Sequence, residues 1–471
     1  MFEEQLVRIK NKLKEAESVD TDQKVFGASS HKYKVSDPIS NPAIERFESK
    51  YRVKLPLSYK EFLLNIGNGG AGPFYGLYPL GHRINELAEK AGEFLGLPAL
   101  IEPGMSDNEW RELTQRIEND DDISDEEFDQ VVAKIYSGIL PIGTQGCTYL
   151  HALVVTGKHA GQVVNVDMDF NKPSFCYEKN FLDWYERWLD EVISGILISD
   201  NPTWFGYLMG GNDNKLLNHF DKTTDFNVKL NALLGLQKLH SISKNGCDRL
   251  QLVYSRECGE IKRIAAQLLV KFSYQKSKKV LEQLIESDDL DFKTACQAVF
   301  WYQKGYSRQW APAIASRIRS VKSPETFQFA IYVLHEAEFD FGDVLVPFYR
   351  SESEEIRVTS YYSLGLLKRK SDYIDQFAAG LNDESPRVVH TVLQALSGVK
   401  SDKLVDEYLR IIKRFKTDEY YILTNLDHRL KELGYKKRSK FIAKHNKRKQ
   451  PHQNNNNNVL KKISDLFKQC G

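Results

Sequence analysis

The sequence predicts an α+β domain followed by an all-α array of repeated helices. Apolar residues recur at helical spacing between residues 41 and 66, apolar and polar residues alternate between residues 138 and 170, and a helical pattern repeats roughly every 30 residues from Asp213 onward. We therefore expect four regions. They are a leading helix and polar linker at 1–34, an α+β domain at 35–200, a helical array at 201–432, and a basic, Asn-rich tail at 433–471.

A glycine-rich stretch follows the front helices. The helix before it has apolar residues spaced by three and four, at Tyr59, Phe62, Leu63 and Ile66. We expect this helix to end at Gly67 with a positive φ. Gly67, Gly69 and Gly72 have the G-x-G-x-x-G spacing of a dinucleotide-binding loop, but that loop follows a strand and opens a helix. Here the glycines follow a helix and precede the aromatic stretch "FYGLYPLG", so we expect a turn and no bound cofactor.

The second half of the α+β domain has the pattern of an antiparallel meander closed by a helix. Alternation over 138–170 is interrupted by turns at 143–146 and 156–161. The segment "FLDWYERWLDEVISG" then has four aromatic residues at helical spacing, which are Phe181, Trp184, Tyr185 and Trp188. We expect these side chains to form core rather than a ligand cage.

The second region repeats a helical hairpin. An apolar residue followed by Lys or Arg, or Pro followed by Arg, opens a helix at Lys229, Lys262, Lys293, Arg357 and Arg387, and a further apolar helix precedes each. A pair of short helices buries its apolar face only by stacking on neighbours, which predicts a solenoid. Asp225, Asp289 and Asp383 lie four residues before three of these positions, where a carboxylate can cap a helix. Residues 212 to 432 resemble the short HEAT-like repeat family.

Composition and motifs favour a non-enzymatic protein. The six cysteines form no C-x-x-C pair, which argues against a zinc site or a disulfide framework. No nucleophile motif or metalloprotease spacing occurs, and no apolar run is long enough to span a membrane. The charged N-terminal segment does not have the pattern of a secretory signal. We expect a cytoplasmic protein with no cofactor and no small-molecule substrate.

The segment at 167–178 partly matches the spacing of a calcium-binding loop. Asp167, Asp169, Asn171 and Glu178 occupy positions 1, 3, 5 and 12 of such a loop. Position 6, which needs glycine, is Lys172. We therefore expect a tight polar turn and no metal.

The tail differs from the rest of the chain in charge. From Tyr435 onward it contains eleven Lys and Arg residues against one acid, Asp465, so the rest of the chain is net acidic. An "NNNNN" run reads as a linker, and Val459, Ile463, Leu466 and Phe467 predict a short amphipathic helix. The tail has three open interpretations: a cap on the array, a contact with a protein partner, or a contact with nucleic acid or an anionic surface.

The front domain resembles the SUKH superfamily, the Smi/Knr-type domain. The residues that carry the resemblance are "AIERFESKYRVKLPLSYKEFLLNIGNGG" at 43–70, "LPIG" at 140–143 and "FLDWYERWLDEV" at 181–192. The resemblance implies a non-enzymatic binding domain, common in bacteria as an immunity protein that neutralises a polymorphic toxin, with some members in regulatory roles. It does not identify the toxin.

A long acidic insertion at about 105–138 departs from the family pattern. It is either a recognition surface or a solvated helical hairpin. Our candidate partner-binding residues are two aromatic anchors and an acidic cluster, namely Tyr75, Tyr78, Asp120, Asp121, Asp122, Asp125, Glu126 and Glu127. An acidic surface steers a basic toxin towards it.

The sequence therefore predicts a two-part binding protein that neutralises a toxin by covering its active face. Two alternatives remain open. In one, the array associates with nucleic acid through the basic tail, which requires a basic stripe on its concave face. In the other, the protein is a regulatory scaffold of the Smi/Knr type.

Overall fold

The computed structural model describes residues 2–119, 123–198 and 204–446. Contacts divide the chain into two units, residues 1–265 and 266–471. The predicted domain boundaries near 35, 200 and 432 stay predictions. No helix in the described part of the chain has the length and apolarity that a bilayer crossing requires.

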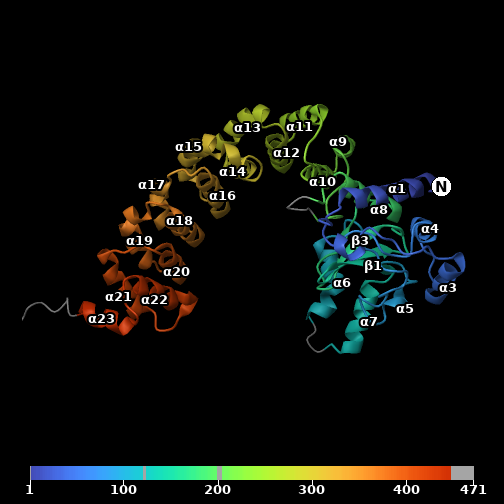
Figure 1. Ribbon diagram of the computed structural model, residues 1–471, viewed down its shortest axis with the longest axis horizontal. Coiled ribbons are helices and arrows are strands. Elements are labelled where there is room, and N and C mark those ends of the chain that lie inside the picture. The colour runs from blue at the N-terminus through green and yellow to red at the C-terminus, as the bar shows by residue number, and fades with distance from the viewer. Residues whose placement is uncertain (1, 120–122, 199–203, 447–471) are drawn as a thin grey trace, which may run out of the picture. The chain divides into compact units, whose positions relative to one another are not determined.

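Unit 1 contains helices, a sheet and then more helices (Figure 1). The helices before the sheet are α1 (Glu3–Val19), α2 (Ala28–His31), α3 (Asn41–Tyr51), α4 (Leu57–Asn65), α5 (Ala91–Phe94), α6 (Asp107–Asn119) and α7 (Asp125–Ile135). The strands are β1 (Ile139–Gly146), β2 (Tyr149–Val154), β3 (Val163–Asp167) and β4 (Ser174–Phe175). The helices after the sheet are α8 (Phe181–Ile193), α9 (Asp213–Asp221), α10 (Phe226–Leu236), α11 (Lys244–Arg256) and α12 (Gly259–Phe272), the last of which runs into unit 2.

The sheet is the predicted antiparallel meander, with strand order β1-β2-β3-β4. The turn predicted at 143–146 is wrong, because these residues continue β1 and the chain turns at 147–148. Leu140 pairs with Leu153, and His151 pairs with Asn165. Side chains alternate between the two faces of the sheet, and both faces are buried. One face packs with α1, α3, α4 and α8, and the other packs with the insertion.

The aromatic stripe of α8 is core, as predicted. Phe181, Trp184, Tyr185 and Trp188 are almost completely buried. The Tyr185 ring lies 4.7 Å from that of Phe62 on α4, and its hydroxyl donates to the Ala71 carbonyl at 2.8 Å. The closing helix therefore joins the front helices to the glycine turn.

The glycine turn differs from its prediction in one respect. Helix α4 ends at Asn65 with Ile66 as its C-cap, and Gly67 is not among the positive-φ residues. The left-handed residues are Gly69 (φ +89°) and Gly70 (φ +100°). A Cβ at Gly67 would lie 2.3 Å from the Ser36 carbonyl oxygen, so close backbone approach is what requires glycine there. Residues 71–80 form turns and a single bridge, not the helix that a phosphate loop needs.

The acidic insertion forms a helical hairpin, α6 and α7, that also completes the core. Trp110, Val132, Ala133 and Tyr136 are buried against Leu150, Val164 and other residues on the second face of the sheet. Ser124 caps α7 by accepting a hydrogen bond from the Glu127 amide. The hairpin is therefore half buried rather than fully solvated.

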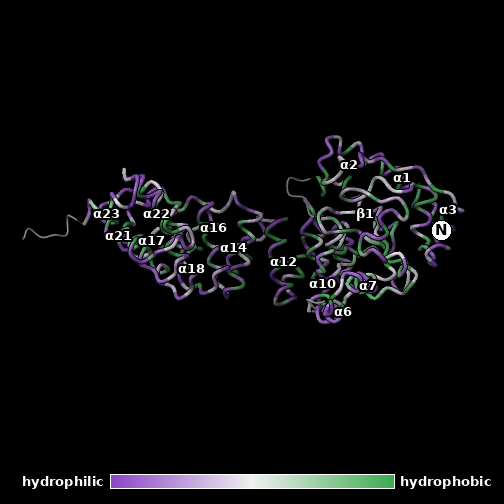
Figure 2. The backbone as a smooth tube through the Cα atoms, turned by 90° about the horizontal axis from the view of Figure 1, so that it is seen from below, coloured by the Kyte–Doolittle hydropathy of each residue, from purple (hydrophilic) through white to green (hydrophobic). Residues whose placement is uncertain are grey.

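Unit 2 consists of packed helices in two layers (Figure 1). One layer contains α14 (Asp289–Tyr302), α16 (Pro324–Glu336), α18 (Glu354–Leu366), α20 (Pro386–Ala395) and α22 (Ile422–Glu432). The other contains α13 (Tyr274–Glu286), α15 (Ser307–Arg317), α17 (Gly342–Leu345), η3 (Val346–Arg350), α19 (Ile374–Leu381) and α21 (Val405–Arg414), and α23 (Arg438–Asn446) follows. Hydrophobic and hydrophilic residues alternate along these helices, as amphipathic packing requires (Figure 2).

The predicted helix caps are correct at one of three positions. Asp225 accepts from the Val228 amide and caps α10. At α14 the cap is Asp288, and at α20 it is Ser385, because these residues stand at the first non-helical position. Asp289 instead accepts weakly from the Lys322 amide, and Asp383 pairs with Arg357.

Candidate functional site

Tyr78 lies in the loop after the glycine turn, beside β1, and is held on both sides. Its amide donates to the Ile142 carbonyl at 2.8 Å, and its hydroxyl donates to Glu86 Oε1 at 3.3 Å. The Arg83 guanidinium lies over the ring, 5.5 Å from its centre. Burial, together with the Glu86 carboxylate, raises the pKa of Tyr78 to about 12. The ring is therefore rigid and only partly exposed.

Tyr75 belongs to a different surface, an aromatic patch that we define as Phe26, Tyr75 and Trp204. The exposed fractions of these residues are 47%, 44% and 57%. The Phe26 ring lies 5.5 Å from Tyr75 and 5.8 Å from Trp204. Three large, half-exposed aromatic side chains from distant parts of the chain therefore contact one another.

Buried groups support the patch from below. The Phe74 ring stacks on Trp204 at 5.2 Å and lies 5.1 Å from the buried His151 ring. Gly27 has a φ of +82°, and a Cβ there would lie 2.2 Å from the Phe74 carbonyl oxygen, so only glycine lets the Phe26 segment approach this closely.

A polar cluster in the sheet holds the segment that carries Trp204. The Tyr207 hydroxyl donates to Gln145 Oε1 at 3.0 Å, and Gln145 Nε2 donates to Asn165 Oδ1 at 2.9 Å. His151 Nδ1 lies 3.1 Å from the same Asn165 oxygen. Burial lowers the pKa of His151 to about 4, against the opposing effect of the Asn165 contact, so the imidazole is neutral near pH 7.

The acidic cluster lies at the start of α7. Asp125 is exposed, and Glu126 pairs with Lys90 at 2.9 Å. Glu127 pairs with Arg116 across the hairpin, and both carboxylate oxygens of Asp129 accept backbone amides of the loop at 89–90. The other candidate acids, Asp120, Asp121 and Asp122, lie outside the described residues.

The candidate residues thus fall into two groups. The loop at 83–90 links Tyr78, through Glu86, to Glu126 on α7, through Lys90. Tyr75 instead packs with Phe26 and Trp204, which the sequence prediction missed. Phe26 and Trp204 do not belong to an apolar periodicity. Only the tryptophan in the polar stretch "SDNPTWFG" could have indicated the aromatic patch from the sequence.

The turn at 167–171 is polar and tight, as predicted. Asp167 accepts hydrogen bonds from the Asp169 amide at 3.1 Å and from the Asn171 side chain at 2.5 Å. Glu178, which would be position 12 of a calcium loop, instead forms an ion pair with Arg187 at 3.0 Å. The described residues contain no group of three acidic, histidine or cysteine side chains arranged to hold a metal.

Comparison with known proteins gives one family match. Residues 38–187 match the model of the SMI1 / KNR4 family (SUKH-1), which is generally non-catalytic. No curated protein matches the chain. One similar solved structure is titled "The structure of the complex of CpcE and CpcF of phycocyanin lyase from Nostoc sp. PCC7120", with 12% identity and a TM-score of 0.27 over 49% of this chain and 96% of that one. The protein therefore contains a SUKH-1 domain at residues 38–187, followed by a long all-helical region.

Proposed function

We propose that this protein is an immunity protein that neutralises a polymorphic toxin by binding it and covering its active face. SUKH domains are known as immunity proteins, which supports this class of function. The observation that carries the proposal is the aromatic patch. Clustered Trp and Tyr side chains are typical of the centres of protein interfaces, because they bury large areas with little loss of side-chain entropy.

The charge of the front region suggests a basic partner. Residues 1–200 contain 33 Asp and Glu residues against 21 Lys and Arg residues. Such a surface accelerates association with a basic protein, and salt screens the effect. We infer that the acidic hairpin steers the toxin and that the aromatic patch provides most of the binding energy.

The helical region supports a second inference, that it is a HEAT-like solenoid. Its helices stack in two layers, and Lys229, Lys293 and Arg387 form ion pairs with Glu257, Glu325 and Glu354 at 2.7, 2.9 and 3.3 Å. Because carboxylates neutralise these repeated basic residues, they do not form the basic stripe that nucleic-acid binding needs. These ion pairs weaken the nucleic-acid alternative, for which the basic tail is the main support.

The test uses the protein encoded next to this chain as the candidate toxin, and it measures cell protection together with association and dissociation rates at two salt concentrations. Trp204→Ala should weaken binding by about 2 kcal/mol, mainly through faster dissociation. Changing Asp120, Asp121, Asp122 and Asp125 to Asn should slow association, and more so at low salt.

Tyr362→Ala is the matched control, since this tyrosine is 57% exposed but lies on α18 in unit 2. It should leave both rates unchanged. Wild-type protection and rates in both front-domain variants would refute the assignment of these surfaces. Absence of any toxic neighbour that the protein binds would favour the regulatory-scaffold alternative.

A further inference from the structure

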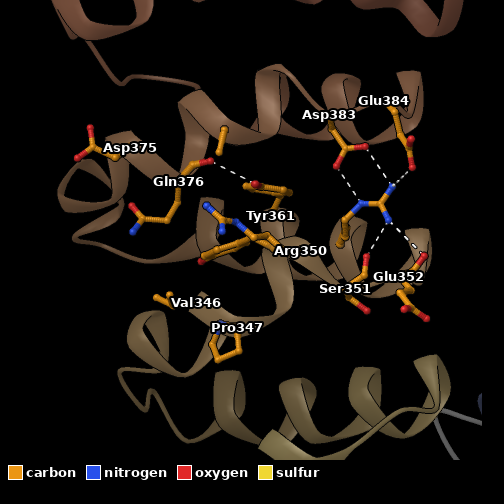
Figure 3. A pocket seen from close by; sticks show the side chains of 13 residues that line it. Val346, Pro347, Arg350, Ser351, Glu352, Tyr361, Asp375, Gln376, Asp383 and Glu384 are labelled. Atoms are coloured by element: carbon orange, nitrogen blue, oxygen red, sulfur yellow. Dashed lines mark hydrogen bonds and ion pairs between the residues drawn. The ribbon is translucent and has the colours of Figure 1, made fainter.

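A cavity of about 1110 Å³ lies in unit 2, between η3, α18 and α19 (Figure 3). It is distinct from the surfaces of the SUKH-1 domain. Its lining residues are Val346, Pro347, Tyr349, Arg350, Ser351, Glu352, Arg357, Tyr361, Asp375, Gln376, Ala379, Asp383 and Glu384. Charged side chains of both signs and apolar side chains therefore share one cavity.

One of the two arginines has a structural role. Arg357 binds both Asp383 oxygens, at 2.8 and 3.1 Å, and also donates to the carbonyls of Ser351 and Glu352 at 2.8 and 3.3 Å. All three guanidinium nitrogens have acceptors, as the dashed lines of Figure 3 show. Arg357 therefore joins α18 to the loop before α20, and four of its five N–H donors are already used.

The second arginine is different. Arg350 makes no hydrogen bond or ion pair with any residue in the described ranges, and Figure 3 shows its side chain beside Tyr361. Its neighbour Tyr349, which also lines the cavity, is only 7% exposed, and its hydroxyl has no partner among the described residues. A buried hydroxyl without a partner is unusual in a folded protein. Arg350, which is exposed, therefore presents unused donors to one end of the cavity, whereas the Tyr349 hydroxyl is buried beneath it.

The opposite end of the cavity is acidic. Glu352 and Glu384 lie at the end of the cavity opposite Val346 and Pro347 in Figure 3. Glu384 is 92% exposed, and its carboxylate lies 3.9 Å from the Arg357 guanidinium. Asp383 already neutralises Arg357, so the two glutamates give this end a net negative charge. Asp375, towards the Arg350 end, pairs with Lys403 at 2.9 Å. The cavity is thus positive at Arg350 and negative at Glu352 and Glu384.

We propose that this cavity binds an extended segment of another protein that carries one acidic and one basic side chain. The carboxylate of the segment lies against Arg350, whose planar guanidinium suits bidentate contact with a carboxylate. The basic side chain lies between Glu352 and Glu384. The exposed side chains of Val346 and Pro347 cover the apolar part of the segment. Nucleic acid does not fit, because the two glutamates repel a polyanion.

The experiment uses the full-length protein and short fluorescent peptides of alanine and glycine that carry one Asp and one Lys at varied separations. Fluorescence polarisation gives the dissociation constants. Arg350→Gln should weaken the best peptide about tenfold, because a charge-assisted contact is lost. Arg350→Glu should abolish binding and restore it for a peptide in which Lys replaces the Asp. Glu352→Gln should weaken only peptides that contain the Lys.

Arg319→Gln is the matched control. Arg319 is exposed and lies on the η2 turn (Ile318–Ser320), outside the cavity. Its replacement by Gln removes the same charge as Arg350→Gln. It should leave peptide binding unchanged. Since the exposed Arg350 side chain makes no hydrogen bond or ion pair with the described residues, its variants should keep the wild-type circular dichroism spectrum.

Three results would overturn the proposal. The first is that no peptide binds in an Arg350-dependent way, and the second is that Arg319→Gln has the same effect as Arg350→Gln. The third is that inorganic phosphate or a single-stranded oligonucleotide displaces the best peptide, which would make the cavity a general anion site. The test needs no toxin, so its outcome is independent of the function proposed for the SUKH-1 domain.

Discussion

Replacing Lys238 with Met should destabilise unit 1 strongly, because this lysine belongs to a buried ion network. Its Nζ lies 2.6 Å from Glu191 Oε2, and the two side chains are 2% and 6% exposed. Glu191 also accepts from Arg187 Nε at 2.9 Å, and Arg187 in turn binds Glu178. Without Lys238, the buried carboxylate of Glu191 keeps only one of its two cationic partners, Arg187. Loss of a partner from a buried pair typically costs about 3 kcal/mol or more.

The assay is denaturant unfolding followed by the fluorescence of the buried tryptophans of α8. Lys222→Met is the control, because Lys222 is exposed at the end of α9 and should change the free energy of unfolding by no more than about 0.5 kcal/mol. The double variant Lys238→Met with Glu191→Gln should lose less free energy of unfolding than the sum of the losses in the two single variants. A loss in Lys238→Met as small as in the control would refute the reasoning.

The ion network of Lys238, Glu191 and Arg187 also limits where the chain can be divided into stable fragments. Lys238 follows α10, beyond the predicted boundary at residue 200, while Glu191 lies before it. A fragment that starts near residue 200 therefore separates a buried lysine from its carboxylate. We expect a fragment of residues 259–446, which keeps all of α12, to be helical and stable. A fragment that starts at 200 should be less stable, because it contains the buried Lys238 without Glu191.

Three further predictions concern the α+β domain. Gly67→Ala should lower the free energy of unfolding by about 2 kcal/mol, because the new Cβ would clash with the Ser36 carbonyl, whereas Gly305→Ala, with open space around it, should be neutral in the same denaturation assay. Burial alone would raise the pKa of Glu186, but hydrogen bonds from Arg8, Lys12 and Gln5 lower it to about 2, so acid titration should show stability lost as pH falls from about 4.5 towards 2, and less so in Glu186→Gln. His151, with its pKa lowered to about 4, should contribute stability that is lost between about pH 6.5 and 4 in calorimetry, and His151→Gln should flatten that slope; an unchanged slope would contradict the buried neutral imidazole.

Periodicity in the sequence determined the classes of the elements. The spacing of Phe181, Trp184 and Trp188 identified a buried helix, and alternation over 138–170 identified the meander, because a helix face and a strand face repeat with different periods. The motif residues at 43–70 and 181–192 also indicated the SUKH family. These properties depend on residues close in sequence, so they were accessible without a structure.

Only the tertiary structure decided which residues form surfaces and sites. The aromatic patch joins Phe26, Tyr75 and Trp204, and no local pattern connects three positions so far apart in the chain. Gly67 looked like a left-handed helix end, but the approach of Ser36 from a distant segment is what requires glycine. Arg350 and Arg357 are seven residues apart and look alike in sequence. Packing nevertheless gives Arg357 four hydrogen bonds and leaves the Arg350 side chain without a hydrogen bond or ion pair among the described residues. Such contacts depend on the packing of the whole unit, which local sequence patterns do not specify.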